Sequence, residues 1–125
     1  MSDIPKFLSI EERHASFRPV GEYSFDATVK MIDAAIEYCR TNAIRGLLVD
    51  ITAVTGFPTP STAERFQFAT QWSATAAGRV ALAMIAPPEM IDPDKIGVTM
   101  ANNRGFLCEV FTNEEDAVRW LGGKS

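Results

Sequence analysis

Two apolar runs decide the fold of this chain: Leu47-Leu48-Val49-Asp50-Ile51 and Val80-Ala81-Leu82-Ala83-Met84-Ile85-Ala86. Neither run alternates between apolar and polar residues, so both faces of each strand must be covered by other elements. Such runs are typical of strands at the centre of a parallel sheet. The segment between them is long enough for a helix, and we therefore expect a right-handed β-α-β crossover.

The helix between the two runs has two competing start signals. Thr59 precedes Pro60, and proline is favoured at the first position of a helix. Ser61 and Glu64 have the spacing of a capping box, in which each side chain bonds the other residue's backbone. Either start predicts a helix that ends just before Gly78.

Helical spacing recurs on both sides of this crossover. Val29, Ile32, Ile36 and Cys39 lie three, four and three residues apart, which predicts a helix over residues 24–41. We expect the residue after that helix, Asn42, to take the left-handed conformation.

Cap signals also place two later helices. Asp92 and Pro93 suit the cap and first position of a third helix, which Gly105 ends. Residues 106–111 form a further strand, and residues 112–115 have the pattern of a capping box that opens a last helix.

The chain begins with two short segments rich in residues that favour strands, residues 7–10 and 15–20, separated by charged residues. They predict a β-hairpin. The complete order is β-β-α-β-α-β-α-β-α. It predicts an α/β fold with a mixed sheet of about five strands, an antiparallel edge made by the hairpin, and helices packed on the sheet. We expect residues 1–125 to form a single domain.

Composition excludes several classes of function. The chain has 125 residues, 46% of them apolar, and a net charge of -4 that is evenly divided between its halves. Without clustered Lys and Arg, binding to nucleic acid or to anionic membranes is not expected. No apolar run approaches the ~20 residues that span a bilayer, and the first residues lack the pattern of a signal peptide. We therefore expect a cytoplasmic protein with no stable membrane insertion.

Few side chains suited to catalysis are present. A single His, His14, cannot build the usual histidine-rich or Cys₂His₂ zinc site. The glycine fingerprints of nucleotide sites and the G-x-S-x-G motif are missing. We expect no catalytic residues, no metal and no cofactor, and we interpret Cys39 and Cys108 as buried free thiols. An enzyme remains the least favoured class.

The most unusual stretch follows the first apolar run, at residues 52–62, which we call the 52–62 loop. It is dense in hydroxyl groups and runs onto a helix N-terminus, where backbone N–H groups favour an anion. The same hydroxyls are also ordinary turn and cap residues, which we favour. Phe57, if exposed, would favour a protein or apolar contact. The candidates for partner binding or phosphorylation are Thr55, Gly56, Phe57, Thr59, Ser61 and Thr62.

Three motifs resemble one family when taken in order. They are residues 47–54 with the following loop, residues 21–24, and residues 110–117 with the later Trp120-Leu121 pair. Over residues 6–121 the chain resembles the small SpoIIAA-like proteins, whose STAS fold occurs in sulfate-transporter tails and anti-sigma-factor antagonists. The resemblance implies that fold and a regulatory, protein-binding module without catalysis.

The resemblance also bears on the 52–62 loop. In anti-sigma-factor antagonists a serine in this loop is phosphorylated by the partner kinase, and the added charge breaks the complex. When the family's loop is aligned with this sequence from Asp50 onward, the part that carries the phosphorylated serine falls on residues 58–61. There, Thr59 and Ser61 flank Pro60. The resemblance therefore implies a protein partner and leaves the modified hydroxyl open.

Two further possibilities remain. SpoIIAA-like proteins are grouped with the lipid-binding Sec14-like domains, which implies a carrier of a small apolar ligand as the alternative function. Phe66, Trp72 and Phe106 are then candidates for the pocket, although we favour the interpretation that they are packed core residues. The apolar residues of the edge hairpin also predict a possible homodimer.

Overall fold

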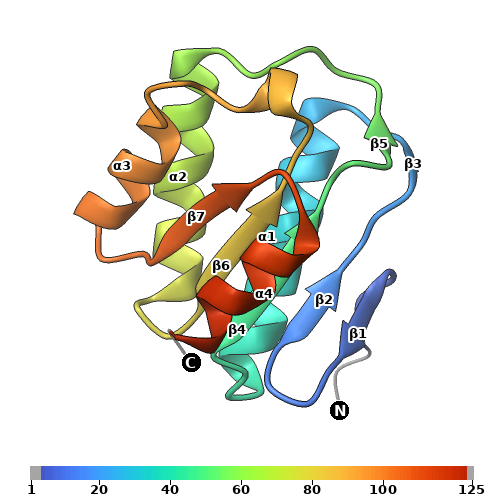
Figure 1. The fold of residues 1–125 in the computed structure, drawn as a ribbon, viewed down its shortest axis with the longest axis vertical. Coiled ribbons are helices and arrows are strands. Elements are labelled where there is room, and N and C mark those ends of the chain that lie inside the picture. The colour runs from blue at the N-terminus through green and yellow to red at the C-terminus, as the bar shows by residue number, and fades with distance from the viewer. Residues whose placement is uncertain (1–3, 124–125) are drawn as a thin grey trace.

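A five-stranded mixed sheet runs through the computed structural model, which describes residues 4–123 (Figure 1). Its spatial order is β1-β2-β4-β6-β7, and β1 pairs antiparallel with β2 while all other neighbours are parallel. The predicted α/β fold with an antiparallel edge is therefore confirmed. The strands are β1 (Leu8–Ile10), β2 (Ala15–Phe17), β4 (Gly46–Asp50), β6 (Ala81–Ile85) and β7 (Cys108–Phe111).

Helices cover both faces of this sheet. Two long helices lie behind the sheet in Figure 1, and the last helix crosses in front of it. The third helix packs beside the second and near β7. The helices are α1 (Phe25–Thr41), α2 (Thr62–Ala76), α3 (Ile96–Asn103) and α4 (Glu114–Gly122).

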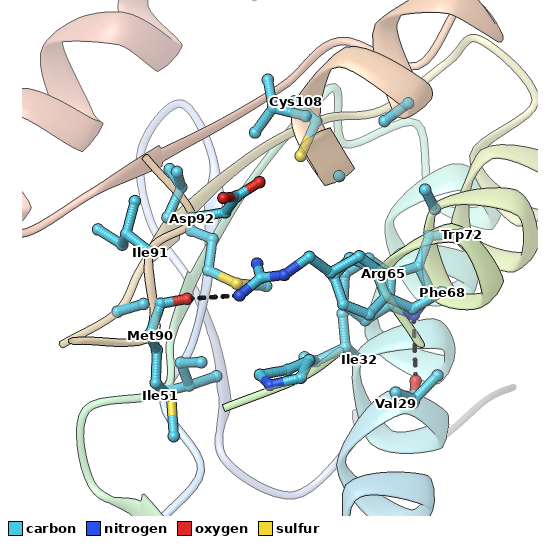
Figure 2. Close-up of a pocket in the computed structure, with 18 of the residues that line it drawn as sticks. Val29, Ile32, Ile51, Arg65, Phe68, Trp72, Met90, Ile91, Asp92 and Cys108 are labelled. Atoms are coloured by element: carbon cyan, nitrogen blue, oxygen red, sulfur yellow. Dashed lines mark hydrogen bonds between the residues drawn. The ribbon is translucent and has the colours of Figure 1, made fainter. Parts of the chain in front are cut away.

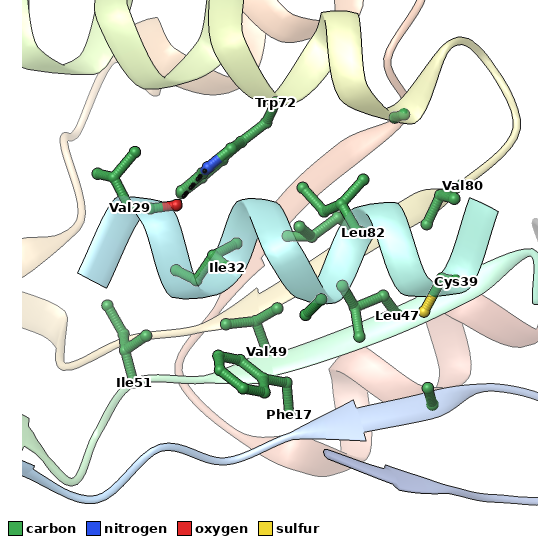
Figure 3. Packing of buried hydrophobic residues seen from close by; sticks show 14 of the residues in the cluster. Phe17, Val29, Ile32, Cys39, Leu47, Val49, Ile51, Trp72, Val80 and Leu82 are labelled. Carbon is green, nitrogen blue, oxygen red and sulfur yellow. Dashed lines mark hydrogen bonds between the residues drawn. The ribbon is translucent and has the colours of Figure 1, made fainter. Parts of the chain in front are cut away.

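The two apolar runs are buried on both faces, as predicted. Leu47 and Val49 pack in the cluster under α1 and α2, whereas Leu48 packs with Leu121 on the α4 side. Figure 3 shows the first of these clusters, with Leu82 of β6 among the side chains around α1. The runs are continuously apolar because their side chains enter two cores, one on each side of the sheet.

The competition between the two caps of α2 is resolved in favour of Ser61. Its Oγ accepts a hydrogen bond from the Glu64 backbone N–H at 3.1 Å, and its own N–H donates to Glu64 Oε1 at 2.8 Å. Both halves of the capping box are present, so two of the free donors at the helix start are satisfied. Thr59 lies outside the helix.

Two predicted details at helix ends are wrong by one residue. Asn42 has φ -103°, and the left-handed residue is Ala43 with φ 58°. Asn42 instead donates from its side chain to the Tyr38 carbonyl at 2.8 Å. The last helix is capped by Asn113, whose Oδ1 accepts from the Asp116 N–H at 2.9 Å, one residue later than the predicted Thr112.

The third helix starts later than predicted. Asp92 does accept a hydrogen bond at the helix start, but from Ile96 N–H at 2.9 Å. Lys95 has φ 48°, a left-handed conformation that interrupts helical geometry until Ile96. A short 3-10 helix, Pro88–Met90, precedes this turn.

A second, two-stranded sheet was not predicted. β3 (Gly21–Glu22) pairs in parallel with β5 (Val54–Thr55), so part of the 52–62 loop is tied to the segment that leads into α1. Each strand has only two residues, which is too short for a sequence pattern to reveal.

Ser16 offers a prediction about stability. This residue lies in β2 with 1% of its surface exposed, and its Oγ is buried without a hydrogen-bond partner among the described residues. Because a buried hydroxyl without a partner loses its bonds to water, Ser16→Ala is expected to raise the free energy of unfolding by about 1 kcal/mol. Urea denaturation measures this change. The exposed Ser9, which faces Ser16 across the strand pair, is the control, and Ser9→Ala should change stability by less than about 0.5 kcal/mol. A loss of stability in Ser16→Ala would contradict the interpretation.

Candidate site at the carboxyl ends of the strands

An apolar cavity of about 90 Å³ lies where α1, α2 and α3 meet the carboxyl ends of the central strands (Figure 2). Ligands of open α/β sheets bind at this end of the strands, and the cavity therefore has the expected position for a site. Its apolar lining includes Val29, Ile32, Ile51, Phe68, Trp72 and Phe106.

Aromatic rings give the cavity its shape. Phe68 and Trp72 stack with ring centroids 4.5 Å apart. The Trp72 Nε1–H donates a hydrogen bond to the Val29 carbonyl oxygen at 3.2 Å, which joins α2 to α1. Phe25 and Phe57 meet edge to face at 5.6 Å. These contacts fix the rings around the cavity.

The charged groups of the lining belong to Arg65, Asp92 and Lys95. Arg65 Nη2 donates to the Met90 carbonyl oxygen at 3.0 Å, so it joins α2 to the segment after β6. Lys95 Nζ lies 3.1 Å from Glu109 Oε1 on β7. Figure 2 shows the Arg65 side chain extending across the cavity toward Met90.

The 52–62 loop is held firmly beside this cavity. Asp50 Oδ1 accepts hydrogen bonds from the Thr52 N–H at 2.9 Å and from Thr52 Oγ1 at 2.6 Å, which fixes the turn after β4. Gly56 has φ 114° and lies so close to Tyr23 that a Cβ at this position would collide with the Tyr23 carbonyl oxygen. Thr59 Oγ1 donates to the Glu89 carbonyl oxygen at 3.4 Å.

The loop candidates fall into three groups. Thr55, Thr59 and Thr62 are exposed and present their side chains to solvent. Gly56 is required by the backbone turn, and Ser61, although exposed, caps α2. Phe57 is half-buried against Phe25 and lines the cavity, so its interpretation as an exposed contact does not hold.

The pocket candidates are also separated by the structure. Trp72 and Phe106 line the cavity, but Phe66 does not. Phe66 is 48% exposed, and its ring lies 4.9 Å below the Arg104 guanidinium. The placement of Phe66 in the pocket is therefore wrong, because α2 turns Phe68 inward and Phe66 outward.

Sequence reasoning missed Arg65 and Met90 as parts of the site. They are 25 residues apart, and their contact depends on the 3-10 helix that carries Met90. No periodicity or motif signals such a contact. The spacing of Arg65 from the Ser61 cap, which places it in the first turns of α2, was the only available hint.

Both cysteines are free, as predicted, but only Cys39 is buried, whereas Cys108 is half-buried. Burial raises the pKa of the Cys39 thiol to about 12. Burial, followed by the negative charge of Glu109, raises the pKa of Cys108 to about 12 as well. Cys108 lines the cavity.

These pKa values predict slow thiol chemistry and a loss of stability in base. At pH 8 the native protein is expected to react slowly with a disulfide reagent, and both thiols should react quickly once urea unfolds it. Because the unfolded thiols ionise near the ordinary value of 9.0, stability is retained below that pH and falls between about 9 and 12. Absorbance of the released thiolate measures the reaction. Rapid labelling of the native protein at pH 8 would contradict the predicted burial.

Comparison with known proteins concerns the fold. No family model and no curated protein matches this chain. Two solved structures are similar in fold. One is an uncharacterised protein of the DUF3478 family with a SpoIIAA-like fold from Shewanella loihica, with 16% identity, a TM-score of 0.49, and coverage of 91% of this chain and 90% of that one.

The second similar structure is the anti-sigma factor antagonist SpoIIAA in its unphosphorylated form. It has 19% identity and a TM-score of 0.48, and the match covers 93% of this chain and 95% of that one. At such low identity the likeness is one of fold alone. Partner, ligand and mechanism must be argued from this chain's own residues.

Residues 4–123 contain neither a membrane-spanning helix nor a cluster of metal ligands. No helix there is both long and apolar enough to cross a bilayer. That part of the chain also contains no group of three or more His, Cys, Asp or Glu side chains arranged to hold a metal ion.

Proposed function

We propose that this protein is a non-catalytic binding module that engages a protein partner through the 52–62 loop and the first turn of α2. The observation that carries the proposal is the combination of exposure and anchoring in this loop. Thr55, Thr59 and Thr62 are exposed, while backbone pairing and the Ser61 cap fix the segment that presents them. A surface already fixed in one conformation loses little entropy when a partner binds.

The proposal predicts that charge added to this loop removes the partner. A triple variant, Thr55→Arg, Thr59→Arg and Thr62→Arg, is compared with wild type by quantitative affinity capture from the source cells. The matched control places arginines at Ala34, Thr41 and Asn103, three exposed positions away from the loop. Proteins captured by wild type and by the control should be lost from the loop variant, because bulky charges block close contact.

The comparison requires that all three proteins melt at similar temperatures. An undiminished set of captured proteins in the loop variant would contradict the proposal.

Phosphorylation of Thr59 or Ser61 would act on the same surface. Both residues are exposed, and the Thr59 hydroxyl is the donor to the Glu89 carbonyl oxygen. A phosphate on Thr59 would remove this donor and place negative charge beside Glu89, which disfavours the present loop contact. Intact mass spectrometry of protein from the source cells tests whether either hydroxyl is modified.

The second candidate function is a carrier of a small apolar ligand. The observation in its favour is the cavity, whose lining is almost entirely apolar. Native mass spectrometry of protein purified from cells tests it, and a co-purifying small molecule is the expected result. Purified protein that carries no such molecule and that binds no added apolar probe would contradict this second function.

A homodimer remains a prediction based on the sheet edge. β1 lies at one edge of the sheet, and Ile10 on it is 52% exposed. An exposed apolar edge strand is a template for pairing with a second chain. Light scattering in solution measures the mass, and a clean monomer across the micromolar range would contradict a dimer.

A further inference from the structure

Arg65 is the unusual member of the cavity lining. Its side chain is half-buried in a largely apolar surface, and it forms no salt bridge among residues 4–123. Its side-chain hydrogen bond goes to the Met90 carbonyl oxygen, a neutral acceptor, at 3.0 Å. A guanidinium has five donors arranged to hold a carboxylate with two parallel bonds, and the one side-chain hydrogen bond of Arg65 leaves most of these donors for a further acceptor.

The other charged groups of the lining are already engaged. Asp92 Oδ2 accepts from the Ile96 N–H at 2.9 Å, and its Oδ1 faces the Asp94 N–H at 3.4 Å. Asp92 therefore serves the turn before α3 and lies beyond salt-bridge distance of Arg65. Lys95 is paired with Glu109 at 3.1 Å. Between these two cations of the lining, Lys95 has a salt-bridge partner among the described residues and Arg65 does not.

The size of the cavity limits what can enter it. Its volume of about 90 Å³ is well below the ~150 Å³ of an engineered protein cavity that binds benzene. The apolar part of a ligand that fits without rearrangement is therefore a short alkyl group. A water molecule in the cavity would form few hydrogen bonds, because the lining offers it few polar partners.

We propose that the cavity and Arg65 form a single site for a small carboxylic acid with a short, branched alkyl body. The alkyl group occupies the apolar cavity, and the carboxylate accepts hydrogen bonds from the Arg65 guanidinium. This inference rests on the second proposed function, that of a carrier, and names the chemical class of its ligand. A charge-assisted bond to a carboxylate is stronger than the bond to a neutral carbonyl, so the ligand competes with Met90 for Arg65.

The site also has a consequence for the segment over the cavity. Arg65 holds Met90, and Thr59 holds Glu89, the residue before it. When the Arg65 guanidinium bonds the ligand in place of the Met90 carbonyl oxygen, the 3-10 helix loses one of these two attachments. The ligand therefore alters the segment that the 52–62 loop contacts through Thr59.

The test compares an acid with its neutral counterpart. Isovalerate and 3-methylbutanamide share the same alkyl group, and only the first carries a charge at neutral pH. Titration calorimetry or NMR with the wild-type protein is expected to show isovalerate binding at least tenfold more tightly. Arg65→Met keeps an apolar side chain and should bind both compounds with equal, weak affinity. Arg104→Met, a change outside the cavity lining, should behave as wild type.

Two further measurements are included. One provides a second variant in case Arg65→Met does not fold, and the other distinguishes a free small acid from the carboxyl end of a protein chain. Arg65→Lys retains the charge without the planar fork, and it should reduce the preference for isovalerate if Arg65→Met does not fold. N-acetylvaline represents the carboxyl end of a protein chain. Tighter binding of N-acetylvaline than of isovalerate would overturn the assignment to a free small acid.

The outcomes separate the inference from the function on which it rests. Equal binding of isovalerate and 3-methylbutanamide to wild type would overturn the role of Arg65 but leave an apolar site in place. No binding of either compound, to wild type or to any variant, would overturn the carboxylate site, and the carrier function falls with it when the purified protein also carries no small molecule and binds no apolar probe.

Discussion

Gly56→Ala is expected to lower the free energy of unfolding by about 3 kcal/mol or more. Gly56 has φ 114°, a conformation that residues with a side chain rarely adopt. An added Cβ would also collide with the carbonyl oxygen of Tyr23 and lie 2.9 Å from its backbone nitrogen. The pairing between β3 and β5 must therefore open to accept it. Urea denaturation followed by circular dichroism measures the change.

Gly78 supplies the matched control for this prediction. It also has a positive φ, 73°, but a Cβ there would meet nothing within 4 Å. Gly78→Ala is therefore expected to cost only about 1–2 kcal/mol, the conformational penalty alone. Equal losses in the two variants would show that the close approach to Tyr23 does not matter, and the 52–62 loop would then lack the anchoring that its proposed role requires.

Trp72→Ala is expected to destabilise the protein by about 3–5 kcal/mol. Trp72 is 3% exposed, stacks on Phe68, and donates a hydrogen bond to the Val29 carbonyl oxygen. Its removal deletes a large ring and leaves that carbonyl without this donor. Trp72→Phe keeps an aromatic ring but not the donor, so a smaller loss of about 1–3 kcal/mol is expected. Thermal or urea unfolding measures both.

The exposed Phe66 is the control on the same helix. Phe66→Ala should cost less than about 1 kcal/mol, because that ring lies outside the cavity and remains 48% exposed. A loss in Phe66→Ala as large as that in Trp72→Ala would contradict the structural separation between the outward and inward aromatic residues of α2.

Much of the fold follows from the sequence because its signals are local. The runs around Leu48 and Leu82 are continuous, which is possible only for strands covered on both faces, and helices do cover both faces. The cap of α2 was one of two alternatives, and Ser61 prevails because its partner Glu64 satisfies two backbone donors at once. In each case the residues that decide the structure lie within a few positions of one another.

The missed features depend on contacts between distant segments. The β3–β5 pair joins Gly21 to Val54, and each strand is too short to carry a pattern. The left-handed conformation of Lys95 delays α3 and follows from no local preference of lysine. The inward turn of Phe68 in place of Phe66 requires the rotation of α2 against the sheet, which sequence spacing left open.

The candidate site divides in the same way. The location of the 52–62 loop at the carboxyl ends of the strands was predictable, because parallel strands bring their following loops to one edge. The contact between Arg65 and Met90 was not, because it requires the 3-10 helix after β6. Exposure also could not be predicted residue by residue, and Phe57 in particular is partly buried within the loop.

Photo-crosslinking in the cells that make the protein tests whether the 52–62 loop contacts a partner. A photoreactive amino acid is placed at exposed Thr59 in the loop, or at exposed Thr41, the last residue of α1 near the opposite end of the sheet. We expect light-dependent adducts with another protein at position 59 and few or none at position 41. Adducts at position 41 with none at position 59 would contradict the proposal that the 52–62 loop engages the partner.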